Sequence, residues 1–124
     1  MKFDEDKIQK AICEYLDIRG VCYWAVPNGG ARSKVEGAKL KATGTKSGVP
    51  DLTLIIDGLY YGLEIKRPAD STHPKGYLSK NQKSMIGKIK DAGGEVKICY
   101  SVADVIVWFA ENFTEMKHET ISNH

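Results

Sequence analysis

A strand-turn-strand pattern in the middle of the chain constrains its fold more than any other feature. Residues 51–66 read DLTLIIDGLYYGLEIK, which is two β-rich stretches separated by Asp57-Gly58. An Asp-Gly pair between such stretches is a strong short-range signal for a two-residue β-hairpin turn. Counting back from this turn places Asp51 directly opposite Glu64 on the same face of the hairpin.

This register brings two carboxylates within about 5 Å of each other, measured between their Cβ atoms. Lys66 lies two residues after Glu64 and points the same way, because side chains alternate along a strand. Facing like charges repel, so folding alone gives no reason for the pair. A divalent cation removes the conflict, since Mg²⁺ prefers oxygen ligands and is commonly held by one or two carboxylates. A neighbouring lysine would then activate a water or stabilise charge on a phosphorane.

A purely structural explanation of these residues stays open from the pattern. Lys66 could neutralise the neighbouring glutamate, and Asp51 could be a solvated residue after Pro50 at the start of a strand. Under the metal-site hypothesis, Gly62 faces Thr53 and leaves room on that surface for a backbone or a ligand to approach. The proline, the hairpin register and the flanking elements favour the metal-site hypothesis.

The rest of the chain predicts helices around a mixed sheet. Besides the hairpin, we expect a short buried strand at 21–26, a strand at 95–100, and helices at 4–19, 33–44, 79–92 and 101–113. The helix at 33–44 has little apolar surface and is expected outside the core. The order α-β-(α)-β-β-α-β-α predicts an α/β fold, in the form of an α+β mixed sheet. We expect one domain over 1–113 and a polar tail over 114–124.

Several individual residues follow from these assignments. The expected helix-capping residues are Asp4, Ser33 with Glu36, Ser79 with Gln82, and Ser101 with Asp104. The last helix is expected to contribute Val105, Ile106, Trp108 and Phe109 to the core. The three widely spaced cysteines, Cys13, Cys22 and Cys99, are expected to be small buried residues.

Charge and hydropathy restrict the class of protein. The net charge is +2, but residues 32–90 contain twelve basic and five acidic residues, a balance of +7. A basic middle is compatible with a polyanionic partner such as nucleic acid, although many lysine-rich surfaces bind nothing. No apolar run approaches the roughly 20 residues of a membrane span, and the N-terminus lacks a signal-peptide stretch. We therefore expect a cytoplasmic protein without membrane contact.

The motif residues together resemble a known nuclease superfamily. Pro50-Asp51 followed by Glu64-Ile65-Lys66 resembles the PD-(D/E)XK signature. The strings GVPDL, LEIK and LSxxQ, together with IQxxI and NGGxR nearer the N-terminus, resemble its VRR-NUC (virus-type replication-repair nuclease) branch. The resemblance covers roughly residues 4–110. It implies a restriction-endonuclease-like core of one helix, a three-stranded meander, a second helix and a further strand.

The resemblance also implies roles for particular residues. Asp51 and Glu64 would hold Mg²⁺ or Mn²⁺, with the Ile65 backbone carbonyl as a candidate third ligand. Lys66 would serve the nucleophilic water, and Gln82 would lie near the metal or the scissile phosphate. These five residues form the implied catalytic centre.

The resemblance also implies a further metal ligand and a set of DNA-contacting residues around this centre. A glutamate on the first helix completes the site in related enzymes, and Glu5 is the matching position. An exposed acid that stabilises the start of a helix is the ordinary alternative for Glu5. The residues that would contact the DNA backbone, or else form solvated surface, are Arg32, Lys34, Lys39, Lys41 and Lys46.

The predicted function is therefore a metal-dependent DNA endonuclease with no small-molecule cofactor. Stand-alone members of the family resemble archaeal Holliday junction resolvases, which implies a homodimer acting on branched DNA in a phage or DNA-repair and recombination context. The alternatives are a flap or nicking nuclease, a restriction or toxin-like nuclease that needs a partner, and a non-catalytic nucleic-acid-binding module. The intact Asp51, Glu64 and Lys66 argue against the last of these.

Overall fold

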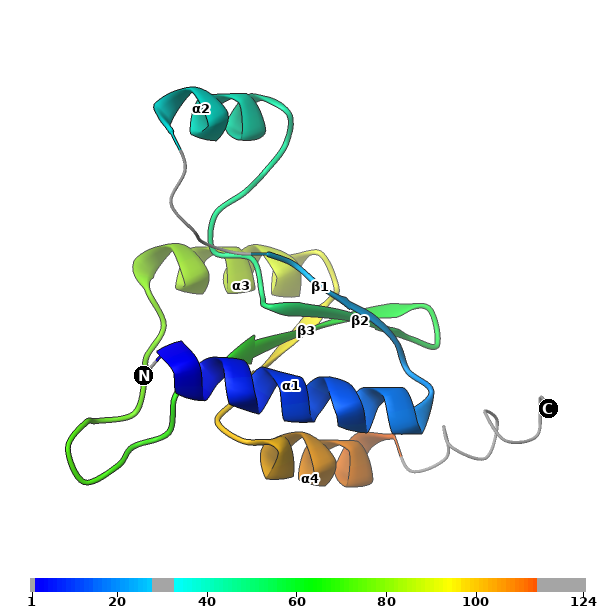
Figure 1. Cartoon of the computed structure of the whole chain (residues 1–124). Helices are drawn as coiled ribbons and strands as arrows, with labels where there is room; N and C mark the ends of the chain where they lie inside the picture. Colours follow the sequence, from blue (N-terminus) through cyan, green and yellow to red (C-terminus); the bar gives the residue numbers. More distant parts are fainter. Residues whose placement is uncertain (1, 28–32, 114–124) are drawn as a thin grey trace.

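The structure is a computed structural model that describes residues 2–27 and 33–113 (Figure 1). Their elements follow the predicted order. These are α1 (Lys2–Arg19), β1 (Cys22–Ala25), α2 (Lys34–Ala42), β2 (Leu52–Ile56), β3 (Leu59–Ile65), α3 (Lys80–Asp91), β4 (Glu95–Cys99) and α4 (Val102–Asn112). The tail at 114–124, the turn residues Asn28-Gly29-Gly30 and Arg32 lie outside the described residues. Among the described helices, none combines the length and hydropathy needed to cross a bilayer.

The four strands form one mixed sheet in the order β1-β2-β3-β4. β1, β2 and β3 pair antiparallel, whereas β4 pairs parallel to β3 after the crossover through α3. The hairpin register is the predicted one, with Leu52 opposite Leu63 and Ile56 opposite Leu59. Asp57 and Gly58 both have positive φ, at 53° and 80°, as a two-residue turn of the hairpin type requires. The mixed α+β fold expected from the sequence is confirmed.

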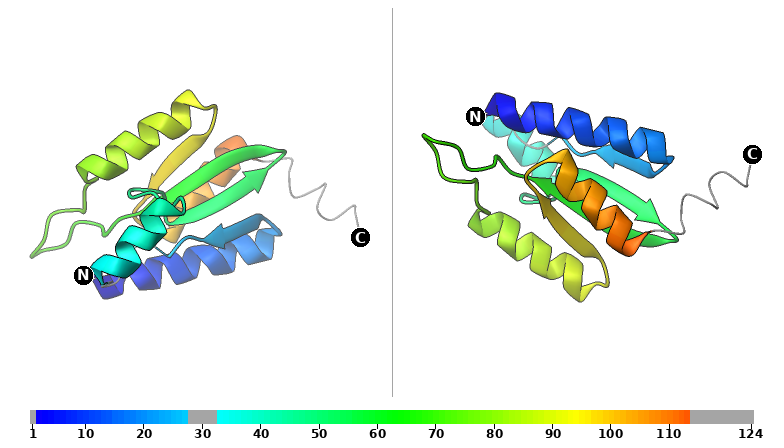
Figure 2. Two further views of the ribbon diagram at one scale, coloured as in Figure 1. Left: turned by 90° about the horizontal axis from the view of Figure 1, so that it is seen from above. Right: turned by 90° about the horizontal axis from the view of Figure 1, so that it is seen from below.

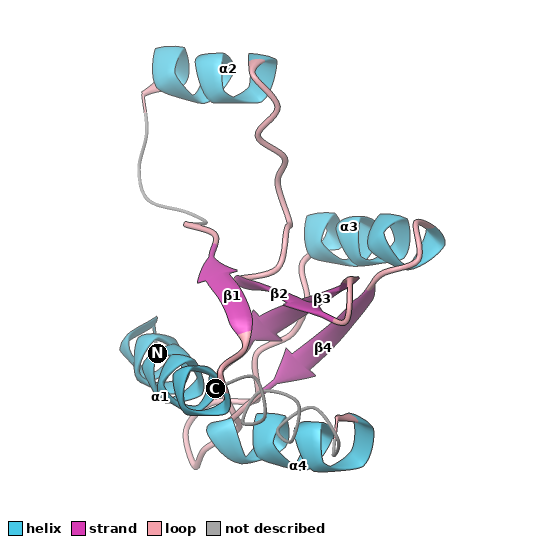
Figure 3. Cartoon of the chain, turned by 90° about the vertical axis from the view of Figure 1, so that its right-hand side faces the viewer, coloured by secondary structure: helices cyan, strands magenta, loops and turns pink. Residues whose placement is uncertain are grey.

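Helices cover the two faces of the sheet unequally. α1 and α4 lie side by side on one face, and α3 lies on the other (Figures 1 and 2). α3 packs against β4, at one edge of the sheet. α2 stands apart from the sheet beyond the end of β1, and none of its residues is buried (Figure 3). The prediction that this helix lies outside the core is confirmed.

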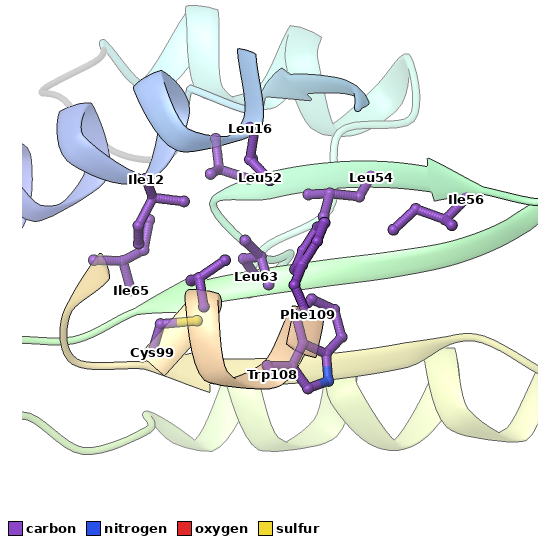
Figure 4. Packing of buried hydrophobic residues seen from close by; sticks show 11 residues of the cluster. Ile12, Leu16, Leu52, Leu54, Ile56, Leu63, Ile65, Cys99, Trp108 and Phe109 are labelled. Atoms are coloured by element: carbon purple, nitrogen blue, oxygen red, sulfur yellow. The ribbon is translucent and has the colours of Figure 1, made fainter. Parts of the chain in front are cut away.

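The hydrophobic core lies between the sheet and the α1–α4 layer (Figure 4). Its side chains come from α1, from both hairpin strands, from the end of β4 and from α4. The largest fully buried members are Phe109, Ile12, Leu16, Leu52, Leu54 and Leu63. Each such side chain contributes roughly 1.5–3 kcal/mol through burial, so this layer fixes the hairpin in place.

The core prediction for α4 was wrong at one residue. Val105, Trp108 and Phe109 are buried, but Ile106 is 43% exposed. Positions i, i+3 and i+4 of a helix share one face, whereas the residue after the first of them is turned about 100° away. Ile106 therefore points away from the core that its three neighbours build.

The N-terminal segment differs from the prediction in its boundaries. α1 begins at Lys2, so Asp4 lies inside the helix and is not its N-cap. The helix ends at Arg19, and Gly20 follows it with a φ of 70°, as expected of a glycine that stops a helix. β1 occupies 22–25 and lies at the sheet edge, so it is mostly exposed and not the buried strand expected. Of the cysteines, Cys99 is buried and Cys13 partly buried, but Cys22 on this edge strand is exposed.

Candidate active site

Asp51 is held at the entrance of β2 by both neighbouring strands. Its main-chain oxygen accepts a hydrogen bond from the Val26 amide at 2.8 Å, which extends the β1–β2 pairing by one residue. Its Oδ2 accepts one from the Ile65 amide of β3, also at 2.8 Å. The hairpin register places Glu64 opposite Asp51, so the two predicted carboxylates do meet.

Pro50 occupies the space that Gly62 leaves open. A Cβ atom at Gly62 would lie 2.6 Å from Pro50 Cγ and 2.9 Å from the Tyr60 hydroxyl oxygen. The expectation was that a backbone or a ligand approaches here, and it is the chain itself that does so, because the fully buried Pro50 ring fills the gap and leaves no room for a ligand. Because Pro50 packs closely on β3, it also fixes the position of the next residue, Asp51.

Gln82 joins the predicted glutamate and lysine into one hydrogen-bonded group. Its Nε2 donates to Glu64 Oε2 at 3.0 Å, and its Oε1 accepts from Lys66 Nζ at 2.9 Å. Lys66 Nζ also lies 3.7 Å from Glu64 Oε2. The Ser79 amide donates to the same Gln82 oxygen at 2.8 Å, within a complete capping box of α3. The capping role and the site role of Gln82 are thus compatible, and the start of α3 is tied to β3.

Glu64 is the electrostatically strained residue of the group. The residue is only 2% exposed, and among the described residues its Oε1 has no hydrogen-bond partner. Burial, with the neighbouring Asp51 as the next cause, raises the pKa of Glu64 to about 8, although Lys66 opposes the shift. An unpartnered carboxylate oxygen beside a second carboxylate costs folding energy unless a cation is bound. This arrangement fits a metal ligand better than a structural ion pair.

The oxygen ligands at this site are of the type that a hard divalent cation prefers, although the protein supplies few of them. The described residues contain no group of three or more His, Cys, Asp or Glu side chains placed to hold a metal. Two carboxylates with no histidine or thiolate nearby match the oxygen preference of Mg²⁺ and Mn²⁺. Mg²⁺ usually keeps several waters and takes its remaining ligands from substrate phosphates, so two carboxylates suffice.

Glu5 lies close to these carboxylates without completing a cluster with them. It lines a pocket of about 300 Å³ together with Asp51 and Ile65. Its charge also contributes to the raised pKa of Glu64, as the smallest of the causes. The structure therefore brings Glu5 and Ile65 to the site.

A second, larger pocket on the other side of Asp51 receives some of the predicted basic residues. It has a volume of about 570 Å³ and lies between α2, the segment 45–49 and the start of α3. Lys41 and Lys46 line it, as do Asp51 and Gln82. Lys34 and Lys39 are exposed on α2 and do not line this pocket.

The segment before Asp51 has a role that the sequence reading did not assign. Gly48 has a φ of 80°, and any Cβ atom there would collide with the backbone of Asn81 at the start of α3. Glycine is thus required for this close approach. The signal was present in the GVPDL string, but its purpose depends on which element packs against it.

The fold and the hairpin motif together define the class, a nuclease-type domain with a PD-(D/E)XK core. Within that class, the VRR-NUC domain model matches residues 3–103, and the chain belongs to the VRR-NUC family. A solved "VRR_NUC domain protein" has a TM-score of 0.66 and 22% identity, covering 89% of this chain and 88% of that chain. A second structure, "VRR_NUC domain", has a TM-score of 0.58 and 18% identity, covering 89% and 97%. A comparison with curated proteins gives no match.

Proposed function

We propose that this chain is a metal-dependent DNA endonuclease that hydrolyses phosphodiester bonds with Mg²⁺ or Mn²⁺. One observation carries the proposal: the buried Glu64 has an unpartnered oxygen, lies beside Asp51, and is linked through Gln82 to Lys66. Burying Glu64 beside Asp51 with one oxygen unpartnered opposes folding, whereas metal-assisted phosphodiester hydrolysis uses two such carboxylates and a nearby lysine. Membership in a nuclease family supports the same conclusion.

The residues divide the chemical work among them. Asp51 and Glu64 would hold the cation, with the Ile65 carbonyl and Glu5 as further ligands from the adjoining pocket. When bound, a divalent cation supplies Lewis-acid polarisation of the phosphate and lowers the pKa of water. Lys66 orients the attacking water and stabilises negative charge, because Gln82 holds its Nζ in place. Gln82 is a positioning residue that fixes both Glu64 and Lys66.

DNA is the proposed substrate, and its backbone would pass through the pocket beside α2. Lys41 and Lys46 supply positive charge there, next to Asp51. We further propose branched, Holliday-junction-like DNA as the structure that is cut, in a phage or repair and recombination setting. A homodimer with two-fold symmetry would place two such sites on opposite strands of a junction.

Cleavage of labelled DNA tests the proposal directly. Linear, flap and four-way-junction DNA are incubated with Mg²⁺, Mn²⁺ or EDTA and wild-type protein, Lys66→Ala or Asp51→Asn. We expect cutting only with a metal, and a loss of about 100-fold or more in both variants. Lys88→Ala, an exposed lysine in the last turn of α3, serves as the matched control and should cut normally.

The substrate pattern separates the alternatives. Cleavage of the junction supports a resolvase, whereas cleavage of flaps or nicking of duplex supports a replication or repair nuclease. Activity on linear duplex but not on the four-way junction would exclude junction resolution. Binding without cutting under every metal would show that the domain is a non-catalytic nucleic-acid-binding module.

A further inference from the structure

β1 carries an exposed aromatic residue that the proposed chemistry does not use. The chain has two tryptophans, and Trp108 is buried in the core at 9% exposure while Trp24 is 50% exposed. An exposed indole places a large apolar surface in water and can be a contact for another molecule. The question is therefore which surface of the domain Trp24 belongs to.

The sheet register places Trp24 on the same face as the candidate active site. Trp24 pairs with Thr53, and Thr53 pairs with Gly62, two residues before Glu64. Alternation along a strand puts Gly62 and Glu64 on one face, about 7 Å apart, and Trp24 shares that face. The preceding residue confirms the direction, because the Tyr23 hydroxyl donates to the Cys13 carbonyl of α1 on the opposite face at 3.2 Å.

No described helix covers this part of the sheet. α3 packs at the far edge against β4, and Ile55, which pairs with Cys22 on the face of Trp24, is 36% exposed. The residues that follow β1 reach the candidate active site. Pro27 lines both pockets beside Asp51, whereas Trp24 itself lines neither of these two pockets. Trp24 is thus an exposed aromatic residue on the Glu64 face of the sheet, three residues before Pro27, which lines the lysine-lined pocket.

We propose that Trp24 stacks on an unpaired nucleobase of the bound DNA, so that the domain selects DNA with unpaired nucleotides beside the cleaved bond. The inference rests on the proposed nuclease function and specifies its substrate further. It favours the flap alternative over a fully paired four-way junction, which offers no free base face. In a duplex, the base faces are already stacked on one another and are not available to an indole. An unpaired base offers a free face, and stacking on an aromatic residue is largely independent of base identity. Lysine contacts to phosphates cannot make this distinction, because both kinds of DNA carry the same backbone.

Binding measured without metal tests the inference apart from cleavage. The probes are a labelled duplex and the same duplex with an unpaired single-stranded flap, both in EDTA. We expect wild type to prefer the flap, and Trp24→Leu to weaken flap binding about tenfold while duplex binding stays unchanged. Trp24→Phe should retain most of the preference, since phenylalanine also stacks. Flap binding should quench the indole emission of wild type and not that of Trp24→Phe.

The control is Leu59→Ala, an exposed apolar residue at the hairpin turn, which should leave both affinities unchanged. Equal loss on flap and duplex, or no loss on either, would overturn the inference. A change from dimer to monomer in Trp24→Leu, with the flap preference intact, would show instead that this surface contacts a second copy of the chain. In each of these cases metal-dependent cutting by wild type would leave the proposed function standing. Wild type that neither binds nor cuts DNA would remove both proposals.

Discussion

The burial of Glu64 beside Asp51 makes the stability of the metal-free domain depend on pH. The pKa of Glu64 is about 8 in the folded protein, against an ordinary value of 4.5. Between these two values the folded state binds a proton that the unfolded chain does not. The free energy of unfolding should therefore fall as the pH rises from about 4.5 to about 8, and then level off.

Glu64→Gln should remove most of this dependence. The amide keeps the size of the side chain and its hydrogen bonds but cannot ionise. We expect the free energy of unfolding of the metal-free variant to exceed that of wild type by roughly 2–4 kcal/mol at pH 9 and by little at pH 5. Urea unfolding in EDTA across this range measures it, with the exposed Glu95→Gln as the control. Parallel pH profiles for wild type and Glu64→Gln would contradict the prediction.

The identity of the central residues was predictable, but their environment was not. Asp51, Glu64 and Lys66 follow from a hairpin turn and the alternation of a strand, both of which are local rules. The burial of Glu64 depends on α3, and the filling of the gap at Gly62 depends on how the preceding loop folds back. Those contacts join segments far apart in sequence, so no local pattern reveals them. The metal, the ligand roles and the limits of the domain remain predictions.

α2 and α3 start with the same kind of cap but serve different purposes. Ser33 with Glu36 and Ser79 with Gln82 are both complete capping boxes. Helix α2 has no buried residue, whereas α3 has a partly buried face and holds Gln82 in the site.

Sequence patterns located both helices, but they do not give the order of the strands in the sheet, and that order decides which strand lies at the edge. For that reason the apolar segment at β1 was wrongly expected to be buried.

Removal of the two caps should consequently have different effects. Ser79→Ala is expected to lower the free energy of unfolding by about 1 kcal/mol and to slow DNA cleavage, because Gln82 loses its anchored helix start. Ser33→Ala should change global stability by only a few tenths of a kcal/mol but speed amide exchange within α2. Urea unfolding and hydrogen exchange measure the two quantities. Equal global losses in both variants would mean that α2 is part of the cooperative core.

Over the whole molecule, positive charge lies beside the site and not uniformly over the surface. Lys41 and Lys46 line the larger pocket at Asp51, while Lys88 and Lys90 lie in the last turn of α3, outside it. DNA binding releases about 0.9 counterions for each phosphate that is neutralised. The salt dependence of affinity therefore reports which lysines face the DNA.

The double variant Lys41→Gln/Lys46→Gln should reduce the slope of log affinity against log salt concentration by about 2. Lys88→Gln/Lys90→Gln is the matched control, with the same change in net charge, and should leave the slope unchanged. Fluorescence anisotropy at several salt concentrations, with EDTA to prevent cutting, measures both. A reduced slope in the control pair would show that DNA approaches over a different face.

The separation of α2 from the core has a consequence for how such a domain can diversify. Because none of the residues of α2 is buried, replacing that helix by one of another length or charge removes no core contact. The site depends instead on Gly48, Pro50 and the strands beyond them, which are fixed by packing. Substrate preference can thus change through exchange of a surface segment while the reaction centre is inherited intact.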